Sequence, residues 1–573
     1  MKNGSRILKR TCALFLIIAA VMLNAFPAQA CTAVYVGQDA SDDGTIMLAR
    51  SNDYQDVWAN YVTIIERVEN KPGRTMPVDH DATVLAPLPD TTYRCTATPW
   101  MDSTVASNGS GRDATVCTNE YGVAMTMSVT AFSNSAVLKA DPLIGHGLTE
   151  NTAVDLVVCQ SATAREGVEV LLSLIDTYGS SEINIAMIAD QKEAWYIEMY
   201  SGHQYAAVKL PTDAVCAFGN EFSLEYLSDY EDYIISPDLE KLAKDSGFAV
   251  YGRGNELNLL ATCSGEEMVT DYSHRRTWIA HRLLAPSGYG DYDKKALYPL
   301  CFSPDKKVSL QDVMAIMRNR FEGTPYDPDE TGRTDIRVIG TDTALSVHVA
   351  QVYPQLPAEM SCVTWESTGP ALNGVFVPVS NAAISVSEAY GRNQPAEDAG
   401  IFDPETYPYY AFKELTTLGV EPKDCKVYGV PVRDYWNKAE TGMTQGMRQV
   451  LSNAAGIEDR EQAALYITDY CNQMQTQAFS DARQLLNDVR WYHSKNSNTL
   501  KNGRNPETHE VIDELKEIDP LEVSLNADPY FVVPEIGEKV RPPARTNQAV
   551  IAAAAVALVL AGALYLLIRR RKD

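Results

Sequence analysis

The residue with the clearest chemical potential is Cys31, which follows a segment typical of a cleaved secretory leader. Basic residues precede an apolar run over 13–22, and Ala28-Gln29-Ala30 is an A-x-A cleavage site. Cleavage after Ala30 would leave Cys31 with a free α-amine beside its thiol. An α-amine has a pKa of about 7.7–8.0 and a thiol one of about 8.5, so the amine could accept the thiol proton near neutral pH. One residue would then supply both nucleophile and base.

Three other interpretations of Cys31 stay open on these residues alone. It could be a lipoprotein cysteine whose amine is acylated after processing, which would remove the base. It could be one half of a disulfide, or an ordinary buried thiol. The lipoprotein interpretation excludes the catalytic role, because an acylated amine cannot act as a base.

The residues after Cys31 predict a β-hairpin that gathers polar groups around it. Residues 31–37 and 45–50 are rich in β-branched and apolar residues, and Asp42-Asp43-Gly44 is a turn signal. A symmetric antiparallel hairpin would place Ser51 opposite Cys31. Arg50 would then favour the thiolate, and Asp53 would orient the α-ammonium. The alternative is that both are polar groups that end an exposed strand.

Further short motifs follow along the chain in a specific order. They are Thr118–Met125 (T-N-E-Y-G-V-A-M), Ala194–Glu198 (A-W-Y-I-E), Gly202–Tyr205 (G-H-Q-Y), Arg276–Trp278 (R-T-W), Glu322–Asp327 (E-G-T-P-Y-D), Leu356-Pro357 and Val377-Pro378. Together with C-T-A-V-Y-V-G at 31–37 and M-L-A-R-S-N-D at 47–53, the chain resembles the PepD-type dipeptidases of peptidase family C69. These are N-terminal-nucleophile hydrolases related to penicillin V acylase and conjugated bile-salt hydrolase. The resemblance extends from Cys31 to the late 480s.

The pattern of elements predicts an α+β fold. Residues 31–137 are mostly strand-like, Thr163 and Glu166 form a capping box before a helix that ends at Gly179, and 183–210 returns to strands. The resemblance implies the four-layer αββα sandwich of N-terminal-nucleophile hydrolases. Residues 443–492 have a strongly helical pattern and are expected to add a helical hairpin, and 494–505 is polar and loop-like.

The resemblance also implies further site residues. Asn119, at the turn of a predicted hairpin, is the first candidate for an oxyanion donor, although N-E-Y-G is also ordinary turn chemistry. Asn220 resembles the second asparagine of the acylase site. Arg276 is the candidate cation near the thiolate or the substrate carboxylate, with Arg275 beside it as the alternative.

Other conspicuous side chains receive structural interpretations. His203 and His348 are expected to be structural, because an N-terminal nucleophile needs no imidazole base. The tryptophans at 195, 278 and 365 are expected in the core.

Composition narrows the class of partner. The formal net charge of −26 disfavours nucleic acid and anionic lipid. The sequence has no CxxC motif or Cys/His cluster, so a structural zinc is not expected. No cofactor is predicted. A disulfide between Cys95 and Cys117 and buried free thiols are equally compatible with the spacing.

The termini predict how the chain is placed in the cell. We expect a signal peptide at 1–30, a hydrolase domain at 31–505, an extended stalk at 506–546, a transmembrane helix at 547–568 and a basic cytoplasmic tail at 569–573. The catalytic domain would be extracellular on a single-pass anchor. Val533-Pro534-Glu535-Ile536-Gly537 leaves attachment to the cell wall by a sortase as an alternative.

These observations lead to one functional expectation and two alternatives. The chain is expected to hydrolyse dipeptides through a thioester on Cys31. The alternatives are an amide hydrolase of the bile-salt or penicillin acylase type, and a non-catalytic surface lipoprotein. Side-chain preference and oligomeric state are not predicted.

Overall fold

The computed structural model describes most of the chain between Cys31 and Pro534. The described residues are 31–54, 58–99, 114–129, 131–265, 269–333, 335–395, 398, 400–421, 424–502, 521–531 and 533–534. The predicted leader, membrane helix and basic tail lie outside them. Among the helices formed by the described residues, none combines the length and apolar character that a membrane span requires.

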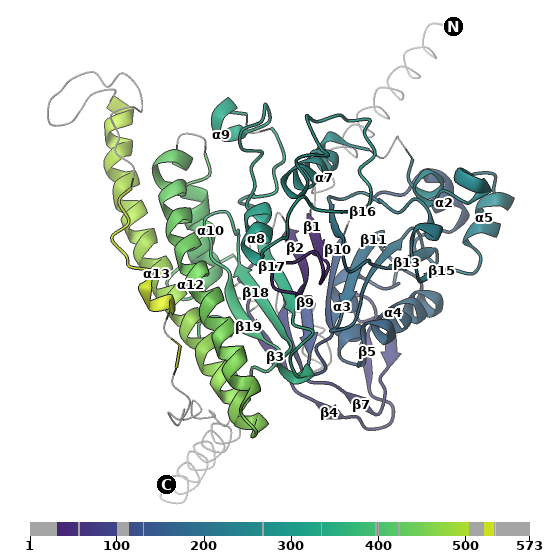
Figure 1. Ribbon diagram of the computed structural model, residues 1–573, viewed down its shortest axis with the longest axis horizontal. Helices are drawn as coiled ribbons and strands as arrows, with labels where there is room; N and C mark the ends of the chain where they lie inside the picture. Colours follow the sequence, from purple (N-terminus) through teal and green to yellow (C-terminus); the bar gives the residue numbers. More distant parts are fainter. Residues whose placement is uncertain are drawn as a thin grey trace, which may run out of the picture.

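Two antiparallel sheets are stacked face to face at the centre (Figure 1). The seven-stranded sheet has the order β16 (Cys301–Phe302), β14 (Val215–Phe218), β1 (Ala33–Val36), β2 (Ile46–Asp53), β17 (Ala344–Val352), β18 (Cys362–Thr368) and β19 (Val377–Ser380). The eight-stranded sheet has the order β15 (Tyr233–Ile235), β13 (Tyr205–Lys209), β12 (Ala194–Met199), β11 (Asn184–Ala189), β10 (Ala124–Val129), β9 (Ala114–Asn119), β8 (Cys95–Pro99) and β3 (Thr63–Ile65). Two small ribbons pair β4 (Val68–Glu69) with β7 (Thr91–Thr92), and β5 (Thr75–Pro77) with β6 (Leu85–Pro87).

Helices cover the outer face of each sheet (Figure 1). The seven-stranded sheet is covered by α7 (Asp271–Leu284), α8 (Leu310–Met317), α10 (Pro408–Leu418), α12 (Val430–Ala455) and α13 (Arg460–Asn502). The eight-stranded sheet is covered by α3 (Glu150–Val158) and α4 (Ala164–Tyr178). Shorter helices are α2 (Ser135–Ala140), α5 (Leu239–Asp245), α6 (Leu259–Cys263) and α9 (Pro328–Thr331).

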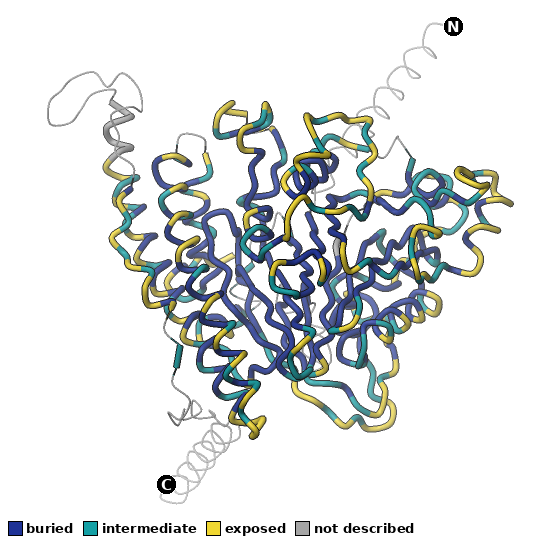
Figure 2. Tube along the Cα trace, in the orientation of Figure 1, coloured by how far each residue is buried: buried dark blue, intermediate teal, exposed yellow. Residues whose placement is uncertain are grey.

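The alternation of side chains along the strands produces the layers. Ala33 and Tyr35 of β1 pack between the two sheets, whereas Val34 and Val36 pack under the helices. Both faces of β1 are therefore buried, as the dark central strands in Figure 2 show. The result is the predicted four-layer αββα sandwich with an added helical region.

Local signals explain several boundaries. The Thr163 side chain accepts a hydrogen bond from the Glu166 backbone amide at the start of α4, and Gly179 ends that helix with φ +73°. The predicted strands of 183–210 occur as β11, β12 and β13. The predicted helical hairpin occurs as α12 and α13, and α12 begins earlier than expected, at Val430. Polar residues after 494 do not form a loop, because α13 continues to Asn502.

The predicted stalk is wrong for its described part. Leu521 and Tyr530 are buried against the helical region, and the Tyr530 hydroxyl donates to Asp481 Oδ2 at 2.8 Å. Gly442 on α12 leaves room for Tyr530 and Phe531, since a Cβ at position 442 would lie about 3.0 Å from both side chains. The segment 521–531 is thus part of the folded domain, because its apolar residues find a surface on α12 and α13.

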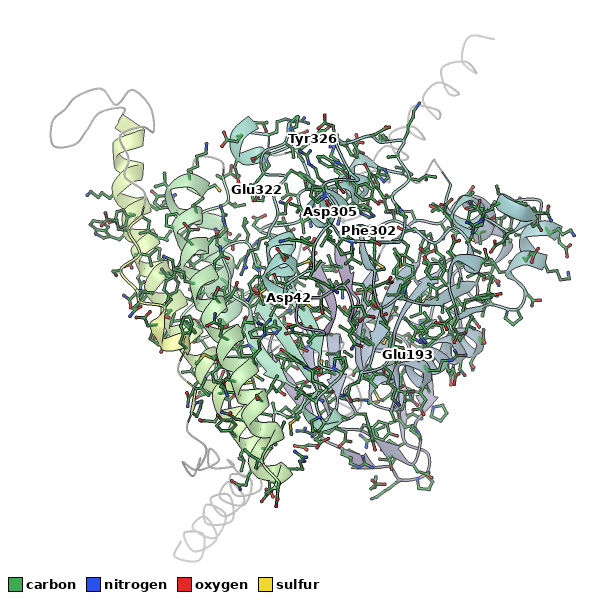
Figure 3. All side chains as sticks on the ribbon, viewed as in Figure 1. Asp42, Glu193, Phe302, Asp305, Glu322 and Tyr326 are labelled. Carbon is green, nitrogen blue, oxygen red and sulfur yellow. The ribbon has the colours of Figure 1, made fainter. Side chains whose placement is uncertain are left out.

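The ten described cysteines are free thiols, including Cys95 and Cys117. Side chains fill the space between the layers (Figure 3), where Phe302 is labelled at the edge strand β16. Its neighbour Cys301 pairs across the strands with Cys216, and their sulfur atoms lie 3.1 Å apart.

Candidate active site

Cys31 lies at the entrance to β1, near the middle of the seven-stranded sheet. The Ser51 backbone amide donates to the Thr32 carbonyl at 2.9 Å, and the Thr32 amide donates to Ser51 Oγ at 3.1 Å. β1 and β2 pair with Ala33 opposite Arg50, so the same register continued by two residues brings Asn52, not Ser51, opposite Cys31.

The predicted hairpin register was therefore wrong by one residue. The connection between β1 and β2 is not a symmetric turn, because Ser41 within it bridges to Val308. A one-residue shift exchanges the two faces of a strand. In the observed register Arg50 projects to the same face as Cys31, which the symmetric hairpin would have prevented.

Arg50 is the nearest cation to the thiol. Its Nη2 donates to Cys31 Sγ at 3.3 Å and to Asn52 Oδ1 at 3.1 Å, and it forms an ion pair with Glu150 at the start of α3. Arg50 is only 1 % exposed. Burial opposes its charge, but the charges of Cys31 and Glu150 outweigh burial and raise the pKa of Arg50. The guanidinium therefore stays charged beside the Cys31 sulfur.

Asp53, at the end of β2, is a buried carboxylate held by Arg337. Its Oδ2 accepts from Arg337 Nη2 and, at 3.3 Å, from Ser51 Oγ. Its Oδ1 is buried and has no hydrogen-bond partner among the described residues. Burial raises the pKa of Asp53 although Arg337 and Arg276 lower it. The unpartnered oxygen is suited to accept from an ammonium group beside Cys31.

Arg276, on α7, binds the backbone of Cys31. Its Nη1 donates to the Cys31 carbonyl at 2.5 Å and to Thr32 Oγ1 at 2.9 Å, and its Nη2 donates to Asn220 Oδ1 at 2.7 Å. Burial and the charge of Arg337 lower the pKa of Arg276 to about 10. Because Asn220 turns its oxygen to this guanidinium, its Nδ2 faces away from Arg276.

The loop that carries Asn220 is held by a buried glutamate from the eight-stranded sheet. Glu198 Oε1 accepts from the backbone amides of Ser223 at 2.7 Å and Leu224 at 3.1 Å. The hydroxyls of Tyr196 and Tyr200 donate to the same carboxylate at 2.6 and 2.9 Å. Burial raises the pKa of Glu198 to about 7, against the lowering effect of these donors.

Asn119 is not brought to Cys31. Its Nδ2 donates to the carbonyls of Val158 and Ser161 at 2.8 and 2.7 Å, and its Oδ1 accepts from the amides of Tyr121 and Val123 at 3.0 and 3.1 Å. All its donors and acceptors are thus used to close the β9–β10 hairpin and bind the end of α3.

The carbonyl of Thr115, which lies 3.4 Å from Arg50 Nη1, marks the end of β9 nearest to Cys31. Asn119 lies four residues further along β9, which places it about 13 Å from Thr115. The prediction of Asn119 as an oxyanion donor is corrected accordingly.

A pocket of about 270 Å³ opens beside the nucleophile. Its walls include Cys31, Arg50 and Asp53 from the first hairpin, Glu150 and Asn151 from α3, and Glu182 from the segment before β11. A carbonyl carbon in this pocket would meet the thiolate on one side and a set of charged side chains around it.

The other singled-out side chains are structural, as predicted. Trp195, Trp278 and Trp365 are 0–1 % exposed within the core. His348 is buried between the sheets and contacts Thr126 Oγ1 at 2.9 Å, and burial lowers its pKa well below the usual range. His203 Nδ1 lies 3.1 Å from Asp141 Oδ1.

Among the described residues, Asp79, Asp81 and His146 have ligand-type atoms within 4.8 Å of one another. Asp79 is already engaged by the Val84 amide at 2.8 Å and by His146 at 2.9 Å. This group is separate from the residues that contact Cys31.

Sequence reasoning missed Glu150, Glu182 and Arg337. Glu150 lies 100 residues from Arg50, and Arg337 lies 284 residues from Asp53. The one local signal was Thr149-Glu150, a helix start with an acidic first turn.

Comparisons with known proteins agree with these motifs. The model of peptidase family C69 matches residues 30–419. Probable dipeptidase B of Streptococcus pyogenes serotype M1 is 31% identical over 389 residues, which cover 64% of this chain and 76% of that protein. Probable dipeptidase B of Lactococcus lactis subsp. lactis (strain IL1403) is 28% identical over 466 residues, or 80% and 94% of the two chains. A solved penicillin V acylase from Agrobacterium tumefaciens matches with a TM-score of 0.28 and 14% identity, over 61% of this chain and 86% of its own.

Proposed function

Because this chain belongs to peptidase family C69, we propose that it is a cysteine dipeptidase that hydrolyses its substrate through a thioester on Cys31. The observation that carries the mechanism is the position of the thiol, 3.3 Å from a buried guanidinium and at the wall of a pocket of about 270 Å³. A cavity of this size suits a small molecule rather than a folded protein or a long peptide.

The reaction begins with attack of the Cys31 thiolate on the carbonyl carbon of the peptide bond. The S–C bond forms, the C–N bond breaks, and the released amine takes up the proton that the thiol gave to the α-amine of Cys31. Water then attacks the thioester and restores the thiol. Asp53 Oδ1 supports the α-ammonium that forms in the first step, because it is an acceptor in the same pocket that has no hydrogen-bond partner among the described residues.

The oxyanion that develops on the carbonyl needs hydrogen-bond donors. Asn220 is the candidate side chain, since Arg276 contacts both its Oδ1 and the Cys31 carbonyl. Arg276 acts as a positioning residue here, because its guanidinium binds the backbone of the nucleophile. Arg50 stabilises the thiolate before attack.

The active enzyme would form outside the cytoplasm. This proposal rests on the A-x-A site before Cys31, the apolar run 549–568 and the basic residues after it. Removal of the leader would create the α-amine that the mechanism uses, so export and activation would be one event. The mass of the mature N-terminus tests it: a free Cys31 supports the proposal, and an acylated one contradicts the mechanism.

The activity itself is tested with purified protein that begins at Cys31. It is assayed against a panel of dipeptides and a matched panel of bile-salt and penicillin amides, with Cys31→Ala as the blank. Dipeptide hydrolysis that Cys31→Ala abolishes, in a protein with unchanged thermal unfolding, is the expected result. Turnover of the acyl amides alone would reassign the substrate class.

A further inference from the structure

The pocket beside Cys31 contains three carboxylates, and two of them already have a cationic partner. Glu150 pairs with Arg50, and Asp53 pairs with Arg337. Glu182 differs, because it makes no ion pair with an arginine or lysine of the described residues. Its carboxylate accepts a hydrogen bond from the Glu150 backbone amide at Oε2, at 2.8 Å, and the charge of His80 also acts on it.

Backbone hydrogen bonds fasten the segment that carries Glu182. The Leu148 amide donates to the Gly179 carbonyl at 2.8 Å, and the Ser181 amide donates to the Leu148 carbonyl at 3.0 Å. These bonds fasten the segment before β11 to the chain that enters α3. The helix N-terminus favours a negative charge at Glu182, but burial opposes it and raises the pKa of this carboxyl. A cation in the pocket would therefore be stabilised by the Glu182 carboxylate, and it would stabilise the negative charge of Glu182 in turn.

A dipeptide brings such a cation to this place. Its α-ammonium is bonded to the carbon next to the carbonyl that Cys31 attacks, so it must enter the same pocket as the carbonyl. An ammonium taken out of water needs a carboxylate partner. Glu150 and Asp53 already pair with Arg50 and Arg337, which leaves Glu182 as the pocket carboxylate without an arginine or lysine ion pair among the described residues.

We propose that Glu182 binds the α-ammonium of the N-terminal residue of the substrate and so restricts the enzyme to peptides with a free N-terminus. This inference rests on the proposed dipeptidase function. It makes Glu182 a specificity residue that acts on the ground state and the transition state alike, because the ammonium does not change during the reaction. An N-acylated peptide would place a neutral amide against a half-buried carboxylate that has no arginine or lysine partner among the described residues.

The test uses two substrates of nearly equal size that differ in this one charge. Alanyl-alanine carries the α-ammonium, and propionyl-alanine lacks it. In the protein that begins at Cys31, Glu182→Gln keeps an acceptor for the Glu150 amide but removes the negative charge. We expect kcat/KM for alanyl-alanine to fall roughly 30-fold or more, mainly through KM. The slow turnover of propionyl-alanine should be unchanged.

Two further variants separate recognition from capping of α3. Glu256→Gln is the matched control, because Glu256 is also half-buried and also accepts from a backbone amide, that of Ser228 at 2.9 Å, but lies outside the pocket. Glu182→Asp retains the charge and should keep a preference for alanyl-alanine over propionyl-alanine, even if Glu182→Gln folds poorly. Loss of that preference in a folded Glu182→Asp overturns the inference.

The remaining outcomes are distinct. If Glu182→Gln lowers kcat/KM equally for both substrates, or for neither, Glu182 is only a cap for α3 and the inference is overturned. If the wild-type protein cleaves no dipeptide, the proposed function falls and takes this inference with it. Hydrolysis of alanyl-alanine by wild type thus separates failure of the inference from failure of the function.

Discussion

The Nη2 of Arg50 lies 3.3 Å from the Sγ of Cys31 and also binds the Glu150 carboxylate. Arg50 comes from β2 in one sheet, and Glu150 comes from the helix that covers the other sheet. The nucleophile therefore lies where the two halves of the sandwich meet. Its charge environment depends on their correct assembly.

Arg50→Lys should lower kcat and slow the alkylation of Cys31 by iodoacetamide at pH 7, each by about tenfold or more, because a lysine cannot contact both Cys31 and Glu150 in the same geometry. Steady-state assays with a dipeptide measure kcat, and timed alkylation without the dipeptide measures the reaction of Cys31 with iodoacetamide. Arg490→Lys is the control, since Arg490 pairs with Glu414 at 2.6 Å on the outer helices. Wild-type alkylation rates in Arg50→Lys would remove Arg50 from the mechanism.

Asn220→Ala and Asn119→Ala should have opposite effects. Loss of an oxyanion donor typically costs about 10²–10³ in kcat, so Asn220→Ala should be slow yet bind substrate normally. Asn119→Ala breaks four internal hydrogen bonds, and should lower the free energy of unfolding by about 2–4 kcal/mol with little change in kcat. Urea unfolding and steady-state kinetics on both variants decide the matter. A kcat loss confined to Asn119→Ala would restore the earlier assignment.

Glu198 should make stability depend on pH. Its pKa is raised from an ordinary 4.5 to about 7 in the folded protein. The folded state therefore binds the proton of the Glu198 carboxyl more tightly than the unfolded state does. The stability that this proton contributes is fully present below pH 4.5 and is lost as the pH rises through 7. Between pH 5 and pH 8 the unfolding free energy of wild type should fall by about 2 kcal/mol more than that of Glu198→Gln. Parallel urea titrations at the two pH values measure this. An equal change of the unfolding free energy between the two pH values in both proteins would contradict the raised pKa of Glu198.

Truncation of the C-terminal region should be tolerated after Pro534 but not after Asp528. The shorter protein loses Tyr530, which is fully buried and bonded to Asp481, and should lose about 3–5 kcal/mol of stability. The protein that ends at Pro534 keeps this residue and the 2.8 Å bond from Tyr466 to the Pro534 carbonyl. Thermal unfolding and dipeptide assays of the two purified proteins give the comparison. Equal melting temperatures would show that the 529–534 segment contributes nothing to the fold.

One extra residue before Cys31 should abolish activity while leaving the fold intact, because an amide nitrogen is not a base. Proteolytic removal of that residue should restore hydrolysis. The measurement is activity before and after removal, with the N-terminus checked by mass. An extended protein as active as the mature one would place the base elsewhere.

Local patterns predicted the elements of this fold well, and long-range geometry less so. The capped helix at Thr163, the strands of 183–210 and the helical hairpin follow from short-range signals. The β1–β2 register did not, because Ser41 leaves the turn to bridge to Val308.

The candidate site shows the same division. Cys31, Arg50, Asp53, Asn220 and Arg276 are brought together as expected. Asn119 is not, since N-E-Y-G encodes a turn that uses the asparagine for itself. Glu150 and Arg337 are defined only by pairing with residues far along the chain, which no local pattern reports.

The position of β1 within its sheet also has a consequence for biosynthesis. β1 is the first described strand, yet it is hydrogen-bonded on one side to β14, which begins only at Val215. The Cys31 carbonyl is bound by Arg276, which is later still. Closing such long loops is slower than forming local structure. A nascent chain therefore carries an unassembled thiol, and hydrolytic competence would require the chain to have folded at least as far as Arg276.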